Sequence, residues 1–174
     1  MSNGTSLSEF VIFWYVDKYF PDVKYRDKPF GSEFDVYIPS INTAIEFDGK
    51  YWHADKLDSD NEKDELCKSH DVRLIRVRDY SLPDTVSAEI VRHDELSWYD
   101  EDDVIKRLLC MLGLKIFDVD IARDSEAIQD AYSVVSKNAY AEWSRMAYDV
   151  MPDVMNAVSS CDMRLLKSDL WSEI

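Results

Sequence analysis

Apolar and polar side chains alternate in two short segments of the chain, over residues 33–38 and 44–48. Successive side chains of a β-strand point to opposite faces, so a period of two predicts a strand in each segment. Asp35 in the first strand and Glu46 in the second point away from the face that their apolar neighbours share. Those neighbours are Phe34, Val36 and Ile38 in the first strand, and Ile45 and Phe47 in the second.

The segment Pro39–Asn42 predicts a tight turn that joins the two strands into an antiparallel hairpin. Folding about this turn pairs Val36 with Ile45 and Asp35 with Glu46, and it puts every apolar pair on one face. Directly opposed Cβ atoms lie roughly 4.5–5.5 Å apart, where two carboxylates repel each other. A divalent cation between them would relieve that repulsion, and Mg²⁺ takes one or two protein carboxylates with water and phosphate oxygens. The alternative is that both acids belong to the solvated face of an antiparallel sheet.

Longer periods and capping signals predict helices around this hairpin. Ser6–Glu9 fits a capping box that opens a helix to about Phe20, and Ser59–Glu62 fits a second that opens a helix to about His70. The apolar spacing predicts further helices over 104–112, ended by Gly113, and from Ser125 towards Val150, with another strand over 72–78. The chain therefore belongs to the mixed α/β class.

The net charge of −15 is unusual for a nucleic-acid-binding protein, which is commonly basic. Residues 1–80 hold 11 Lys/Arg against 16 Asp/Glu, whereas residues 81–174 hold 9 against 19. The acidic second part favours weak non-specific DNA affinity, a protein partner, or mimicry of DNA.

Cysteine usage and hydropathy place the protein among intracellular proteins. The three cysteines (Cys67, Cys110 and Cys161) are far apart and form no C-x-x-C pair, which is typical of the reducing cytosol and disfavours a structural zinc site. The chain has no apolar run long enough to span a bilayer and no signal peptide, so we expect no membrane partner.

Residues 33–39, followed by 44–53 with Gly49, Tyr51, Trp52 and His53, resemble the very-short-patch-repair branch of the PD-(D/E)XK nucleases. The resemblance is nearest to the phage and homing endonucleases that share an E-D-x-H-D pattern, and it covers about residues 6–80. It implies a restriction-endonuclease-like core, a mixed β-sheet flanked by helices over residues 1–115. Residues 116–174 would then form a helical C-terminal extension.

The same resemblance implies a set of site residues. Asp35 and Glu46 would hold Mg²⁺ (or Mn²⁺), and the other catalytic positions would be His53, Asp60 and Glu9. Asp48 stands where the family's core motif has lysine, so His53 would take over that role. The expected DNA contacts are Tyr51, Trp52, Arg73, Arg76 and Arg78.

Several of these residues have a plain structural alternative. Glu9 is also the capping glutamate of its helix, and Asp60 stands near a helix N-terminus, where the helix dipole favours negative charge. Tyr51 and Trp52 are also suited to packing the end of the hairpin. His70 and His93 compete with His53 as the catalytic histidine.

The carboxylates and the histidine together predict a Mg²⁺-dependent DNA endonuclease that hydrolyses phosphodiester bonds. The alternative function is a non-catalytic acidic binding protein with a nuclease-like fold. Such a protein would act as a DNA mimic or inhibit a protein partner, and the net charge of −15 favours it.

Overall fold

A computed structural model gives the fold and describes residues 6–50, 56–94 and 101–137. The chain divides into two compact units, one over Ser6–Ile128 and the other made of 1–5 and 129–174. Apart from the helix over residues 121–137, which continues into the second unit, every element discussed below lies in the first unit. Of the second unit the structure describes residues 129–137, which are helical.

Five strands form one mixed sheet in the order β1-β2-β3-β4-β5. β1 pairs with β2 and β2 with β3 in antiparallel fashion, whereas β3, β4 and β5 run parallel to one another. The carboxyl ends of the three parallel strands therefore meet the beginning of β2 at a single edge. The strands are Lys24–Asp27, Phe34–Ile38, Thr43–Asp48, Arg73–Asp79 and Glu89–His93.

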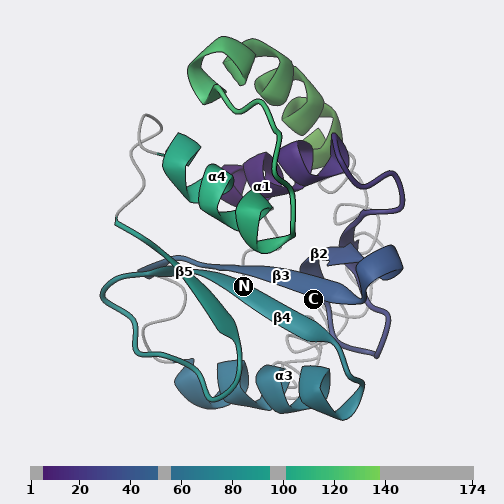
Figure 1. Cartoon of the computed structure of the whole chain (residues 1–174), viewed down its shortest axis with the longest axis vertical. Helices are drawn as coiled ribbons and strands as arrows, with labels where there is room; N and C mark the ends of the chain where they lie inside the picture. The colour runs from purple at the N-terminus through teal and green to yellow at the C-terminus, as the bar shows by residue number, and fades with distance from the viewer. Residues whose placement is uncertain (1–5, 51–55, 95–100, 138–174) are drawn as a thin grey trace, which may run out of the picture. The chain divides into compact units, whose positions relative to one another are not determined.

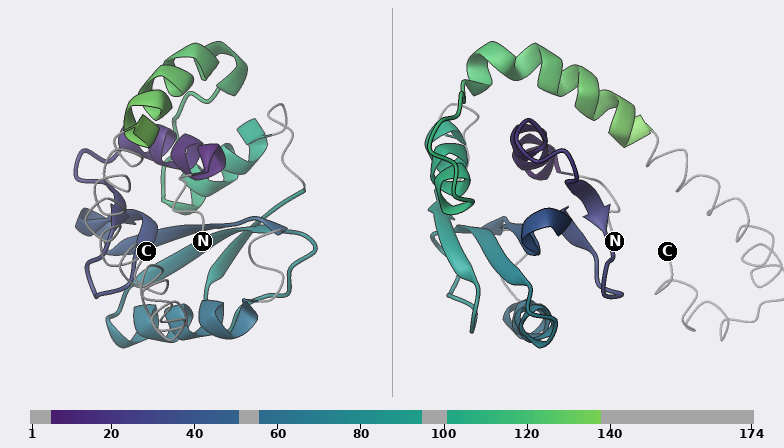
Figure 2. Two further views of the ribbon diagram at one scale, coloured as in Figure 1. Left: turned by 180° about the vertical axis from the view of Figure 1, so that it is seen from behind. Right: turned by 45° about the vertical axis from the view of Figure 1, so that its right-hand side comes forward.

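Helices cover both faces of this sheet, which confirms the mixed α/β class (Figure 1). α1 (Leu7–Asp17) and α4 (Glu101–Met111) lie on one face, and α3 (Leu57–Ser69) lies on the other, as the view in Figure 2 also shows. α3 links β3 to the parallel β4, as such a crossover requires. Residues 80–88 link β4 to β5 without a helix.

The two helices α1 and α4 pack against the sheet through apolar side chains. Their buried residues are Phe10, Val11, Ile12, Tyr15, Val16, Val104, Ile105, Leu108 and Leu109. The capping box that opens α1 is confirmed, because Ser6 Oγ accepts the Glu9 N–H and Glu9 Oε2 accepts the Ser6 N–H.

The predicted end of α4 is confirmed in detail. Gly113 takes a positive φ of 89°, its N–H donates to Cys110 O, and the Leu114 N–H donates to Leu109 O. These two hydrogen bonds form a Schellman motif, in which a left-handed residue, usually glycine, closes a helix.

The predicted hairpin has the predicted register. Val36 pairs with Ile45 and Ile38 pairs with Thr43. The turn is a short 3-10 helix, Pro39–Ile41, followed by Asn42 in the left-handed region with φ of 44°. Asn42 Oδ1 accepts the hydroxyl hydrogen of Tyr37 at 2.7 Å, which ties the turn to the strand before it.

Other boundaries differ from the prediction. α3 begins at Leu57, and Ser59 does not cap it, because its hydroxyl donates to Lys56 O within the first turn. α1 ends at Asp17 rather than near Phe20, and the last described helix begins at residue 121 rather than at Ser125. The sequence pattern predicted neither β1 nor β5, since both are short and carry charged residues.

No helix within the described ranges is both long and apolar enough to cross a membrane.

The apolar packing of α4 leads to a stability prediction. Leu108 is fully buried, so Leu108→Ala should lower the free energy of unfolding by about 2–5 kcal/mol. Ile116 is 90% exposed, and Ile116→Ala should change it by no more than about 0.5 kcal/mol. Urea denaturation measures both, and equal losses in the two variants would contradict the assignment of α4 to the core.

Candidate functional site

Asp35 and Glu46, here called the acid pair, meet where β2 and β3 stop pairing through their main chains. The Asp35 N–H donates to Glu46 Oε1 at 3.3 Å, and the Phe47 N–H donates to Asp35 Oδ2 at 2.8 Å. Each carboxylate thus accepts a hydrogen bond from the main chain of the opposite strand. The predicted proximity of the two acids is present in the fold.

Glu46 is only 5% exposed and Asp35 is half-buried, so the acid pair does not form a solvated face of the sheet. Burial, and after it repulsion from Glu9, raise the pKa of Asp35 to about 7. Burial and then repulsion from Asp35 raise the pKa of Glu46 to about 8. The folded protein therefore disfavours two ionised carboxylates at this position.

Lys63 of α3 supplies the cation at the acid pair. Its Nζ lies 2.6 Å from Glu46 Oε2 and 5.3 Å from the centre of the Phe34 ring. Its charge lowers the pKa of both acids and so partly offsets the effect of burial. Two carboxylates and one ammonium keep one negative charge in excess when all three are ionised.

Sequence reasoning did not single out Lys63 as a site residue, although a signal was present. Asp60, Asp64 and Cys67 are the buried residues of α3, at the i, i+4 and i+7 positions of one helix face. Lys63 is three residues after Asp60 and therefore lies beside that face. Lys63 thus brings an ammonium group to the acid pair from the helix.

Glu9 caps α1 and also interacts electrostatically with the acid pair. It forms the capping box with Ser6, and burial followed by the charge of Glu46 raises its pKa. Repulsion from Glu9 also contributes to the raised pKa of Asp35. Glu9 therefore adds negative charge at the site while it opens α1.

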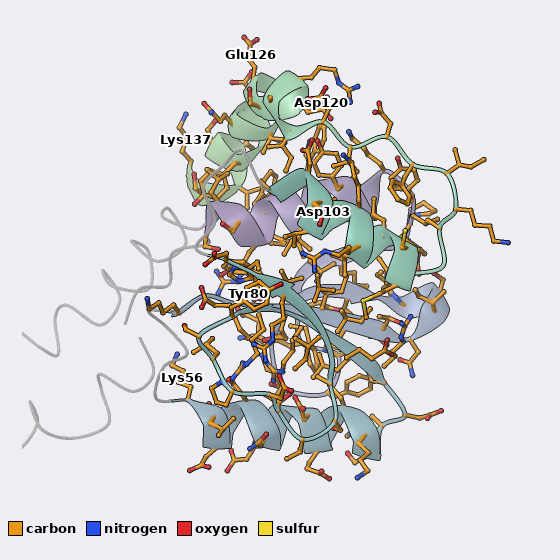
Figure 3. The ribbon with its side chains drawn as sticks, turned by 60° about the vertical axis from the view of Figure 1, so that its left-hand side comes forward. Lys56, Tyr80, Asp103, Asp120, Glu126 and Lys137 are labelled. Carbon is orange, nitrogen blue, oxygen red and sulfur yellow. The ribbon has the colours of Figure 1, made fainter. Side chains whose placement is uncertain are left out.

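A second group of charges, here called the Asp–Arg cluster (Asp48, Asp60, Asp64, Arg76 and Arg78), fills the space between α3 and the sheet. Arg76 donates from Nε to Asp64 at 2.9 Å and from Nη1 to both oxygens of Asp48 at 3.0 and 3.1 Å. Arg78 donates from Nη1 to Asp48 and, at 2.8 Å, to Asp60. In Figure 3, nitrogen and oxygen atoms of side chains are visible between the sheet and α3.

The expectation that Arg76 and Arg78 contact DNA phosphates is wrong for this fold, because neither guanidinium is exposed. Both hold carboxylates in the interior instead. Arg73, the third predicted contact, lies at the opposite end of β4 and donates to both oxygens of Glu89 at 2.6 and 2.7 Å. The predicted role of Asp60 is untested, and its carboxylate accepts from Arg78.

The remaining predicted residues divide into two groups. Tyr51, Trp52 and His53 lie outside the described residues. His93, at the end of β5, is 3% exposed and stacks on Phe47, and burial lowers its pKa, which favours the neutral imidazole. His70 is exposed and caps the end of α3.

The acid pair suits a hard divalent cation such as Mg²⁺ or Mn²⁺ better than a softer metal such as zinc or copper. In the part of the chain that the structure describes, no three His, Cys, Asp or Glu side chains are grouped to hold a metal. Mg²⁺ does not need such a group, since it keeps several waters and binds one or two carboxylates. The donor set is all oxygen and carries excess negative charge, so it fits a hard divalent cation.

The raised pKa values predict how stability depends on pH. Unfolded carboxyls have pKa values of about 4, so between about pH 4 and about pH 8 the metal-free folded state binds more protons than the unfolded state. The acid pair should therefore make the free energy of unfolding fall as the pH rises from about 4 to about 8. Glu46→Gln should flatten the fall, as measured by urea denaturation at pH 5, 6.5 and 8. The exposed Glu65→Gln should not, and equal slopes in wild type and Glu46→Gln would contradict the assignment.

The Asp–Arg cluster predicts a large effect of a single substitution. Arg76→Met removes a buried guanidinium that pairs with both Asp48 and Asp64, and should lower the free energy of unfolding by about 3–5 kcal/mol. Arg73→Met, on the same strand, breaks a partly exposed ion pair and should cost about 1 kcal/mol or less. Chemical denaturation measures the difference, and similar losses in both variants would argue against a tightly paired interior cluster.

No family model, curated protein or solved structure matches the chain. The resemblance of residues 6–80 to nucleases therefore remains a prediction from sequence motifs.

Proposed function

We propose that the protein is a divalent-metal-dependent endonuclease that hydrolyses phosphodiester bonds in DNA, with Mg²⁺ (or Mn²⁺) as its metal. The observation that carries this proposal is the acid pair, a buried Glu46 beside a half-buried Asp35, with Lys63 at 2.6 Å from Glu46. Its position at the carboxyl ends of parallel strands agrees with the general location of sites in open α/β sheets. The mixed sheet flanked by helices is compatible with the restriction-endonuclease-like core that the sequence motifs imply.

In this proposal, Asp35 and Glu46 hold the metal, which when bound stabilises charge on the scissile phosphate and promotes ionisation of a water molecule. Asp35 and Glu46 would hold the metal in their ionised form, which burial otherwise disfavours. Lys63 donates one hydrogen bond to Glu46 and has further N–H groups for a phosphate oxygen or the attacking water. Its charge also offsets the negative charge that develops on the phosphate.

Placing two carboxylates side by side away from water destabilises the folded state. This cost supports an active site over a purely structural role. A stability-optimised hairpin would carry apolar residues at positions 35 and 46, because burial of two adjacent carboxylates destabilises the folded state. Sites that violate such rules are commonly functional.

The second candidate is a non-catalytic acidic protein that mimics DNA or inhibits a protein partner. Two observations favour it, the net charge of −15 and the burial of Arg76 and Arg78, which removes two predicted phosphate contacts from the surface. Such a protein would have no need of the acid pair.

A plasmid-nicking assay with and without Mg²⁺ distinguishes the two candidates. Wild type should nick supercoiled DNA only with metal, Asp35→Asn should abolish nicking, and Lys63→Met should slow it by about 100-fold or more. The matched control is Asp58→Asn, which removes an exposed acid from α3 and should retain the wild-type rate. Unchanged nicking in Asp35→Asn, or none by wild type with either Mg²⁺ or Mn²⁺, would reject the nuclease proposal.

A further inference from the structure

We infer that Asp64 is a positioning residue, which fixes α3 on the sheet in the one orientation that brings Lys63 to Glu46. This inference rests on the proposed function for its catalytic meaning, whereas the contacts that support it do not. It assigns a role to a buried acid that the proposed chemistry does not otherwise use.

α3 is attached to the sheet in part through buried charged side chains. The buried residues of this helix are Asp60, Asp64 and Cys67, so two of the three are charged. Apolar burial is non-directional and tolerates rotation of a helix about its axis. Hydrogen-bonded ion pairs depend on distance and angle, and therefore define the rotation.

Asp64 makes more of these directional contacts than a simple ion pair would. Its Oδ1 accepts from Arg76 Nε at 2.9 Å, and its Oδ2 accepts the N–H groups of Ser87 and Ala88, both at 3.0 Å. One carboxylate thereby joins α3 to β4 and to the end of the segment that leads into β5. The side chain itself is fully buried.

The order of charges on α3 and on the sheet favours one orientation of the helix. Lys63 and Asp64 are consecutive in α3, and their partners Glu46 and Arg76 are directly paired between β3 and β4. The positive Lys63 therefore lies opposite the negative Glu46, and the negative Asp64 lies opposite the positive Arg76. A shift that moved Lys63 onto Arg76 would oppose like charges in a buried setting, which costs several kcal/mol. The Asp64–Arg76 contact thus selects the orientation in which Lys63 reaches the acid pair.

The direct test observes the Lys63 ammonium in the metal-free, full-length protein. Its contact with Glu46 should slow hydrogen exchange enough to give an NMR ammonium signal, assigned by its absence in Lys63→Met. Asp64→Asn keeps the shape of the side chain but loses its charge, and the signal should disappear. Asp58→Asn, on the exposed side of α3, should keep it.

A double-mutant cycle on the nicking rate tests the catalytic consequence. If Asp64 acts through Lys63, the two changes are not additive, so Lys63→Met should slow the Asp64→Asn protein by less than about 10-fold instead of about 100-fold. If Asp64→Asn fails to fold, Asp64→Glu retains the charge but displaces the helix, and it should give the same direction of change in both measurements.

Persistence of the Lys63 signal in a folded Asp64 variant would overturn the inference, as would a full effect of Lys63→Met in that variant. Both results would leave Asp64 a purely structural residue. Absence of nicking by wild type would reject the proposed function alone, because the ammonium signal still decides whether Asp64 positions Lys63.

Discussion

The attachment of α3 through the Asp–Arg cluster is the interaction on which the candidate site depends. Removing these charges from water is costly, and each carboxylate must be met by a guanidinium or a main-chain N–H to offset that cost. Arg76 meets two carboxylates and a carbonyl oxygen at once, Asp60 O lying 2.9 Å from its Nη2. The gain from such a network lies in a defined geometry more than in stability, and a defined geometry is what Lys63 requires.

The helices on the two faces of the sheet are therefore held by different interactions. On one face, α1 and α4 bury apolar side chains such as Val11 and Leu108, which supply non-directional stabilisation in proportion to area. On the other face, a smaller apolar cluster that includes Ala44, Cys67 and Leu74 lies beside the buried charges that orient α3. The apolar packing of α1 and α4 offsets the free-energy cost of burying charges beneath α3. This compensation is needed because the total stability of a domain is only about 5–15 kcal/mol.

The sequence predicted the features that depend on neighbours along the chain. The hairpin register followed from alternation on both sides of one turn, the beginning of α1 from Ser6 with Glu9, and the end of α4 from Gly113. It missed β1 and β5, whose pairing comes from the adjacent strand rather than from their own composition. It also assigned Arg76 to the surface, because the acid that buries this arginine, Asp48, is 28 residues away and only the fold brings them together.

The opposed charge order of Lys63–Asp64 on the helix and Glu46–Arg76 on the sheet has a consequence for how this protein can diverge. A lineage that lost the acid at 64 would leave the arginine at 76 with fewer partners, so neutral replacements at both positions should arise together. The same holds for 63 and 46, whereas the solvent-facing positions of α3 can drift independently. In related chains, the two pairs should therefore appear as columns that vary jointly, the signature of residues in contact.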